Sequence, residues 1–308
     1  MVTLFYTKIH SEFFIFLGVA LHYTIHHLKK QIILMVKILL LIQLKEGILM
    51  FNNHDVKDIF SGKIANSWEE KSKYISKVIG EDNKIIFFIK KYIKPNMDIL
   101  EIGCGTGKLL QQIDNLSTNL NLTGIELSND MLNNAKKKIF NNNISFINSA
   151  IEDFLPNKQY DLIIMKQVLH HLSSKEKIFK KLSGFLKTNG KLIIMTPNDK
   201  YQMNIIKFKS INDSLGRISD SMIYNYISNL PLIVLSIQHV NSIAKFCSLY
   251  EYFMFLYSIG SLQKIYDYKY NYIFVLKFIY MFKNILKKQI PILVNFNYSY
   301  IIITKIME

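Results

Sequence analysis

From residue 82 onward, short apolar runs alternate with amphipathic stretches at a regular spacing. The runs Met97–Ile102, Leu120–Glu126 and Ile144–Asn148 predict strands, and the stretches between them predict helices. Tyr160–Met165 and Lys191–Thr196 continue the series. Their near-continuous apolar character is typical of strands that are buried on both faces. The alternation predicts an α/β fold, a doubly wound, mostly parallel sheet with helices on both faces.

Start and stop signals delimit three of the helices. Asp82–Lys94 reads as an amphipathic helix that Pro95 stops, and Ser128 can cap a helix that runs to about residue 140. The sequence Ser173-Ser174-Lys175-Glu176 has the pattern of a capping box, which predicts a helix to Lys187. Asn189-Gly190 is expected to close that helix before the next strand begins.

After Pro197 the pattern is less regular. Leu232–Val240 is expected to be a sixth strand, and Tyr298–Ile306 is expected to be the last one. Asn241–Gln289, between them, is rich in Phe and Tyr and is expected to be a helical insertion. Its aromatic residues could form a core, an apolar acceptor pocket or a membrane-facing surface.

These patterns divide the chain into four parts. Residues 95–200 are expected to be the ligand-binding core, 50–94 to be N-terminal helices that form a lid, and 201–308 to complete the fold on the acceptor side. Residues 1–49 form a hydrophobic extension with two apolar runs, each too short to span a bilayer. An interfacial membrane helix, a helix packed on the domain and an untranslated upstream segment all stay open for this extension.

The composition changes the picture in two ways. The net charge of +15 suggests an anionic partner, but Arg217 is the only arginine among 38 basic residues. Because nucleic-acid readers favour the rigid arginine fork, a nucleic-acid partner is disfavoured. Two cysteines, Cys104 and Cys247, cannot build a disulfide scaffold and lack metal-ligand spacing, so we expect a cytoplasmic protein without a metal site.

The strongest chemical signal lies directly after the first strand of the regular series. Gly103, Gly105 and Gly107 alternate there, and a helix is predicted to follow. Such glycines let a ligand touch the backbone, and the helix N-terminus presents N–H groups to an anionic group. A dinucleotide fingerprint would need a further glycine where Lys108 stands, so NAD or FAD binding is disfavoured.

Two acidic residues stand at the ends of neighbouring predicted strands. Glu101 precedes the glycine turn and can meet a cationic group, and Glu126 ends the second strand. A carboxylate at that second position can accept hydrogen bonds from both hydroxyls of a ribose. The pair therefore predicts a site for a nucleoside with a positively charged tail.

Five segments in series resemble the motifs of class I methyltransferases that use S-adenosylmethionine (SAM), in the branch that acts on small molecules, quinones and lipids. The resemblance covers about residues 85–200. Its segments are DILEIGCGTGKLL (98–110), LTGIELSNDML (122–132), ISFINSAIEDFL (144–155), YDLIIMKQVLHHL (160–172) and LKTNGKLIIMTP (186–197). The resemblance implies a seven-stranded Rossmann-like sheet and SAM as the cofactor.

The resemblance also assigns roles to residues. Gly103, Gly105 and Gly107, with Cys104 among them, are expected to line the methionine end of SAM, near Glu101. Glu126 is expected to bind the ribose and Leu127 to pack on the adenine. At the adenine edge stand Ile151 and Glu152. The backbone carbonyl of Lys166 is expected to meet the ligand ammonium.

The chain departs from the family pattern at one position. Many relatives carry Asp where Ala150 stands, and that carboxylate binds the adenine amino group. Ser149 or Glu152 is expected to take its place.

The resemblance leaves the acceptor chemistry open. Methyl transfer mainly needs alignment, and a base is required only when the acceptor must lose a proton. His170 and His171 are the candidate bases, with His171 slightly favoured over His170, and local packing or hydrogen bonding is the alternative role for both. The expected function is methylation of a small or lipid-like acceptor, with peripheral membrane contact as an option. An RNA methyltransferase and a non-catalytic SAM-fold binding module are the alternatives.

Overall fold

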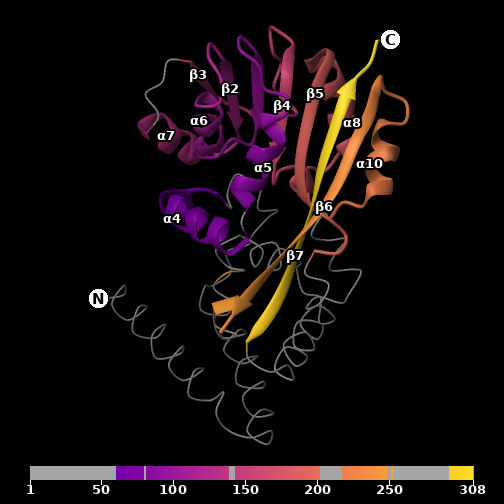
Figure 1. Cartoon of the computed structure of the whole chain (residues 1–308). Coiled ribbons are helices and arrows are strands. Elements are labelled where there is room, and N and C mark those ends of the chain that lie inside the picture. The colour runs from indigo at the N-terminus through magenta and orange to yellow at the C-terminus, as the bar shows by residue number, and fades with distance from the viewer. Residues whose placement is uncertain are drawn as a thin grey trace, which may run out of the picture.

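One seven-stranded sheet forms the centre of the molecule (Figure 1). The computed structural model describes residues 60–79, 81–138, 143–201, 217–247, 251–252, 255 and 291–307. The strands are β1 (Asp98–Ile102), β2 (Asn121–Glu126), β3 (Ile144–Asn148), β4 (Tyr160–Lys166), β5 (Leu186–Pro197), β6 (Leu232–Phe246) and β7 (Ile292–Lys305). Their order is β3-β2-β1-β4-β5-β7-β6, and β7 alone runs antiparallel to its neighbours. The predicted doubly wound sheet is confirmed.

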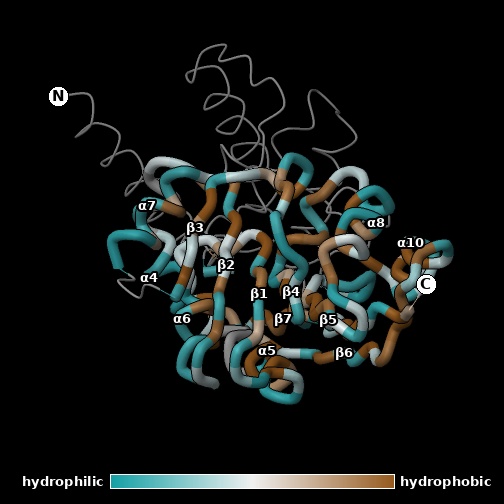
Figure 2. The backbone as a smooth tube through the Cα atoms, turned by 90° about the horizontal axis from the view of Figure 1, so that it is seen from above, coloured by the Kyte–Doolittle hydropathy of each residue, from teal (hydrophilic) through white to brown (hydrophobic). Residues whose placement is uncertain are grey.

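Helices cover both faces of this sheet, as the view from above shows (Figure 2). Within the described ranges they are α4 (Gly62–Ile79), α5 (Glu81–Lys90), α6 (Lys108–Asp114), α7 (Asn129–Lys138), α8 (Lys175–Phe185) and α10 (Asp220–Ile227). Apolar residues of α5 and α6 pack in the core on one face, and those of α8 and α10 pack in the core on the other. Helix α10 was not predicted from the sequence.

The central strand β1 shows why the apolar runs lack alternation. Ile99 faces the core with α5 and α6, while Leu100 and Ile102 face the core with α8 and α10. All three side chains are at most 2% exposed. Because helices cover both faces, every position of the strand is apolar except Asp98 at its start and Glu101 near its end.

The boundary between α8 and β5 differs from the prediction. The helix ends at Phe185, and β5 begins at Leu186, so Asn189-Gly190 lies inside the strand rather than at a helix end. The register between β4 and β5 shifts at Tyr160/Leu162, and Asn189 adopts a positive φ of 64°. The capping box is also wrong, because Ser174 is the N-cap and its side chain makes no cap hydrogen bond.

The last two strands are longer than predicted. β6 continues to Phe246, so the expectation of helix from Asn241 onward is wrong for 241–246. Side chains in this part alternate, with Ala244 and Phe246 buried and Ile243 60% exposed, and the whole length pairs with β7. This alternation has the period of a strand, and cross-strand pairing stabilises it. Residues 251, 252 and 255 are helical, as expected.

The β6–β7 ribbon projects beyond the carboxyl ends of the parallel strands (Figure 1). Pro197, the last residue of β5, pairs with Tyr298, so the part of β7 before Tyr298 pairs with β6 alone. In the parallel part of such sheets, ligands bind beyond the carboxyl ends of the strands. The ribbon therefore extends on the ligand side of the molecule.

Several expectations fall on residues outside the described ranges. They concern the extension 1–49 and most of the aromatic insertion, including Tyr250, Phe253 and Tyr257. Across the described ranges, no helix has both the length and the apolar character needed to cross a membrane.

Candidate functional site

The glycine turn lies at the carboxyl end of β1. Gly103, Gly105 and Gly107 have φ values of 68°, 55° and 74°, which residues other than glycine rarely adopt. A Cβ added at Gly103 would come within 2.4 Å of Cγ2 of Val168, on the segment after β4. The turn therefore requires glycine at Gly103 for two reasons, backbone conformation and the close approach of Val168.

Glu126, at the end of β2, is held by backbone N–H groups from two directions. Its Oε2 accepts a hydrogen bond from Gly105 N at 2.9 Å, and its Oε1 accepts one from Ser128 N at 2.8 Å. A carboxylate oxygen can accept more than one hydrogen bond. The carboxylate is thus fixed beside the glycine turn, and each oxygen keeps acceptor capacity for a hydroxyl of a ligand.

A residue that sequence reasoning missed supports the same loop from β3. The side-chain amide of Asn148 donates to the carbonyl of Glu126 at 2.8 Å and to the carbonyl of Leu127 at 3.0 Å. Ser149 N also donates to the carbonyl of Glu126, at 3.1 Å. The loop from β2 to α7 is therefore held on both sides. An asparagine at the end of a strand carries no motif that would have identified this role.

Burial shapes the electrostatics around the turn. Desolvation raises the pKa of Glu126, although hydrogen bonds from the N–H groups of Ser128 and Gly105 act in the opposite direction. Desolvation, followed by the charges of Glu101 and Glu126, raises the pKa of the Cys104 thiol well above its usual value. Cys104 is therefore a protonated, buried thiol, and the two acids create a negative potential that favours a cationic ligand.

The end of β4 forms the other side of the site. Gln167, directly after Lys166, has a φ of 61°, and its N–H donates to the carbonyl of Met195 at 2.8 Å. A left-handed conformation at a non-glycine residue is strained, and such strain is frequent at functional sites. No pattern in the sequence predicted this conformation. It fixes the direction in which the backbone leaves β4 after Lys166.

The two histidines occupy a short 3₁₀ turn after β4, Leu169–His171. The rings of His170 and His171 lie 3.9 Å apart between centroids, at an angle of 38°. The ring of Phe60, at the start of the described chain, meets that of His171 edge-on at 6.1 Å. Both histidines are half-buried on the carboxyl side of the sheet, the side of the glycine turn.

The predicted adenine edge follows β3. Ile151 is 4% exposed and packs in the core with α8, whereas Glu152 is exposed and its carbonyl accepts a hydrogen bond from Lys181 Nζ at 2.5 Å. The Ser149 hydroxyl donates to the carbonyl of Ala150 at 2.8 Å. Of the two residues expected to replace the missing carboxylate, Ser149 therefore already donates to its own loop.

The structure brings most of the predicted site residues to one edge of the sheet. The glycine turn follows β1, Glu126 ends β2 and precedes Leu127, Ile151 and Glu152 follow β3, and Lys166 ends β4. Their roles toward a ligand remain predictions. Across the described residues, no group of three or more His, Cys, Asp or Glu side chains could hold a metal ion.

The residues present fit SAM chemically. A desolvated carboxylate at Glu126 suits the ribose hydroxyls, and a second buried acid, Glu101, 3% exposed, suits a cation. The turn at Gly105 is open, because an added Cβ would meet only Met131 Cε, at 3.5 Å. The strand order defines a class I methyltransferase fold, and a nucleoside site at the ends of β1 and β2 remains a prediction.

Comparison of the sequence with known families agrees with this class. The model of the methyltransferase domain family matches residues 93–251, just over half of the 308 residues. The chain belongs to this methyltransferase domain family, and the resemblance seen in its motifs is confirmed.

Curated relatives show which members of the family the chain is similar to. Malonyl-[acyl-carrier protein] O-methyltransferase 2 of Ilyobacter polytropus is 38% identical over 120 residues, covering 38% of this chain and 46% of the relative. The corresponding enzyme of Priestia megaterium is 34% identical over 42% of this chain and 48% of its own length. The ubiquinone biosynthesis O-methyltransferase of Rickettsia felis is 28% identical over 33% and 42%. The chain thus spans about half the length of the relatives it matches.

Solved structures share the fold at low sequence identity. The YcgJ protein of Bacillus subtilis covers 72% of this chain and 97% of its own, with a TM-score of 0.52 and 16% identity. Phosphoethanolamine N-methyltransferase 2 of Haemonchus contortus covers 81% of this chain and 57% of its own, with a TM-score of 0.51 and 17% identity. These likenesses confirm the architecture.

Proposed function

We propose that the chain is a SAM-dependent methyltransferase that acts on a small or lipid-related acceptor. The observation that carries the proposal is the Glu126 carboxylate. It is held by Gly105 N and Ser128 N beside a glycine turn, in a chain of the methyltransferase domain family. Named relatives methylate malonyl groups on an acyl carrier protein or ubiquinone precursors by O-methylation. Both kinds of name support a lipid-related acceptor.

When bound, SAM supplies an electrophilic methyl group on a sulfonium. The chain's own residues would then bind and align. Glu126 would accept hydrogen bonds from the ribose hydroxyls, the glycine turn would lie along the methionine end, and Glu101 would contribute negative charge near the ammonium. The acceptor approaches from the side of His170 and His171, either of which can take a proton from an oxygen acceptor.

Among the described residues, the acceptor side beyond β5 and β7 is aromatic and includes a buried cation, Arg217. Phe246, Tyr252, Phe255 and Phe296 are at most 1% exposed, so these four rings form a core. The guanidinium of Arg217 lies 5.2 Å from the ring centre of Tyr201, and burial lowers its pKa to about 10, so it stays charged at neutral pH. Because these four rings are buried, they do not form a membrane-facing surface.

Titration calorimetry with SAM and, separately, with NADH tests the cofactor. Micromolar binding of SAM without a response to NADH is expected, and Glu126→Ala should abolish the SAM signal. An acceptor screen then follows the production of S-adenosylhomocysteine (SAH) with malonyl thioesters, quinone precursors and lipids. Turnover with RNA alone, lost at high salt, would favour the RNA methyltransferase alternative. SAM binding without turnover on any acceptor would favour the non-catalytic binding module.

A further inference from the structure

The first described residues of the chain, 60–62, are attached to the loop that carries Glu126. We call residues 60–62 the strap. Ser128 Oγ donates a hydrogen bond to the carbonyl of Phe60 at 2.7 Å, across 68 positions of sequence. Gly62 N donates to Asp130 Oδ2, also at 2.7 Å. Farther along α4, Asn134 Nδ2 donates to the carbonyl of Ala65 at 3.1 Å. The start of α4 is therefore anchored to α7 and to the residues just before it.

The side chain of Phe60 reaches the opposite side of the site. Its ring lies 6.1 Å from the ring of His171, which follows β4, while its carbonyl is held by Ser128, which follows β2. β2 and β4 are the two neighbours of β1 in the sheet. Phe60 thus extends over the carboxyl end of β1, where the glycine turn lies.

Ser128 connects this strap to the carboxylate that faces the ribose. Its backbone N–H donates to Glu126 Oε1 at 2.8 Å, and its hydroxyl donates to the carbonyl of Phe60. The hydroxyl oxygen also accepts from Met131 N at 3.3 Å, in the first turn of α7. Ser128 is 1% exposed, so these hydrogen bonds are shielded from water and breaking one of them leaves a buried polar group unsatisfied.

We propose that Ser128 is a positioning residue that couples ribose binding at Glu126 to closure of the strap over the cofactor. The inference rests on the SAM site of the proposed function. A ligand that fixes the Glu126 carboxylate also fixes Ser128, and a fixed Ser128 holds Phe60 against His171. By linkage, the placed strap then raises the affinity for the cofactor product, and a strap that covers the site slows its dissociation. Phe60 forms an aromatic wall between the reaction site and solvent.

The chain contains a natural reporter for this contact. Trp68 is the only tryptophan, and its ring meets the ring of Phe60 edge-on at 5.1 Å between centroids. The intrinsic fluorescence of the full chain therefore reports the surroundings of Phe60 directly. SAH is a suitable probe, because it binds without needing an acceptor.

The test compares the full chain with Ser128→Ala, Ser128→Thr and Phe60→Ala. In the unmodified chain, SAH should change Trp68 emission and dissociate slowly. Ser128→Ala should lose most of that change and release SAH about five-fold faster, the effect of one hydrogen bond. Ser128→Thr keeps the hydroxyl and should restore both. Phe60→Ala should release SAH faster with Ser128 intact, which covers the case that Ser128→Ala folds poorly. The exposed Ser173→Ala is the matched control and should change neither.

The outcomes separate this inference from the cofactor assignment. Calorimetric binding of SAH to the unmodified chain without a change in Trp68 emission would overturn the coupling and leave the cofactor site standing. An unchanged release rate in both Ser128→Ala and Phe60→Ala would do the same. Absence of any SAH binding to the unmodified chain would overturn the cofactor assignment, and this inference with it.

Discussion

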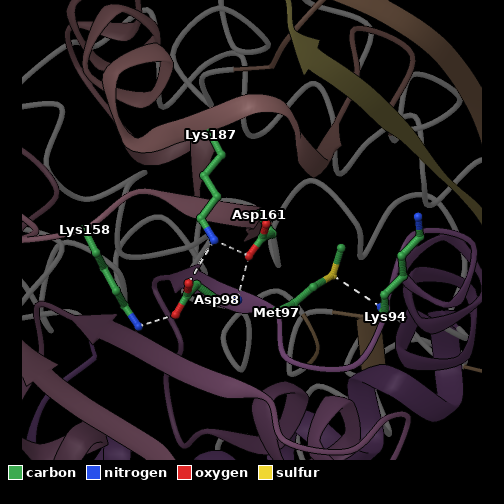
Figure 3. A network of polar contacts seen from close by, with 6 residues as sticks. All are labelled: Lys94, Met97, Asp98, Lys158, Asp161 and Lys187. Carbon is green, nitrogen blue, oxygen red and sulfur yellow. Dashed lines mark hydrogen bonds and ion pairs between the residues drawn. The ribbon is translucent and has the colours of Figure 1, made fainter.

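The two ends of the parallel strands carry acidic residues in opposite environments. At the amino end, Asp98 of β1 pairs with Lys158 at 2.6 Å and with Lys187 at 3.0 Å, and Lys187 also pairs with Asp161 at 2.7 Å (Figure 3). At the carboxyl end, Glu126 is bound by backbone N–H groups, and Glu101 is buried near the glycine turn. One edge uses its charges to close a network, whereas the other concentrates negative charge toward a ligand.

The pKa shifts of the two edges follow the same division. Burial alone would raise the pKa of Asp98, but the hydrogen bonds and charges of Lys158 and Lys187 hold it below its usual range. Burial dominates at Glu126 and raises its pKa. A lowered carboxyl pKa stabilises the fold at neutral pH, and a raised one costs stability there. The amino edge therefore serves stability, and the carboxyl edge gives up stability for a binding site.

The largest expected effect is at Gly103. Gly103→Ala places a Cβ 2.4 Å from Val168 Cγ2 at a φ of 68°. Left-handed strain of about 1–2 kcal/mol and overpacking of about 1–3 kcal/mol should lower stability and abolish measurable SAM binding. Thermal unfolding and calorimetry measure the two effects. For the unfolding measurement the control is Gly62→Ala, which has a φ of 52° with nothing within 4 Å of the added Cβ, so it should show the strain alone; it does not serve for the affinity, because Gly62 belongs to the strap. Normal SAM affinity in Gly103→Ala would refute the site map.

Glu126→Ala should have the second-largest effect, which is a loss of SAM affinity. Two hydrogen bonds from ribose hydroxyls to a charged group, at about 1.5–3 kcal/mol each, imply a SAM Kd at least about 100-fold higher. Glu70→Ala, at an exposed position of α4, is the control and should bind normally. Equal affinity of the two variants for SAM would remove Glu126 from the site.

The raised pKa of Glu126 gives a pH dependence with a definite sign. Protonation removes the charged acceptor, so SAM affinity should fall as the pH drops through a pKa above the usual 4.5 of a glutamate. The ligand-free fold should behave in the opposite way. Glu126 ionises at lower pH in the unfolded chain than in the folded one. The fold therefore loses stability as the pH rises from the unfolded pKa to the raised folded pKa of Glu126. Calorimetry and unfolding measured across this acidic range would show both trends.

The sequence predicted the central part of the molecule well, and physical reasons explain where it failed. β3 has the predicted bounds, and β1, β2 and β4 agree within two residues, because strands buried on both faces produce uninterrupted apolar runs. The end of β6 failed because Asn241–Phe246 carries polar residues that fit an amphipathic helix equally well. Only pairing with β7, about fifty positions later, determines its conformation.

The candidate site likewise contains residues that the sequence predicted and residues that it did not. The glycine turn and Glu126 could be predicted, because their roles follow from position at the ends of consecutive strands. Asn148 acts through its amide on carbonyls 21 and 22 positions away, and Ser128 acts on a carbonyl 68 positions away. Such contacts are created by the tertiary fold. No spacing in the sequence distinguishes these two polar residues from the many other Asn and Ser side chains.

Asn148→Ala should have a moderate effect on SAM affinity, which tests the binding role of the carboxyl edge. It removes two hydrogen bonds to the loop of Glu126, and a net value of about 0.5–1.5 kcal/mol for each implies a rise in SAM Kd of about 5–150-fold. The fold should lose little stability, because Asn148 is exposed. Calorimetry provides the affinity. Asn133→Ala, at an exposed position of α7, is the control with unchanged affinity. An effect of equal size in both variants would indicate a general loss of structure.

The smallest expected effect is at the amino edge, where a substitution tests whether stability and binding are separate. Asp98→Asn removes the charge that two half-exposed lysines share, so the free energy of unfolding should fall by about 1 kcal/mol at neutral pH. Because the folded pKa of Asp98 is lowered, this stability is present above the unfolded pKa and is lost as the pH falls through the folded one. The variant and the unmodified chain should therefore converge in acid, as denaturant titrations at neutral and acidic pH would show. SAM affinity should not change, because Asp98 lies at the opposite end of β1 from the glycine turn. A loss of affinity as large as that in Asn148→Ala would mean that the two edges are mechanically coupled through β1, and the division between stability and binding would not hold.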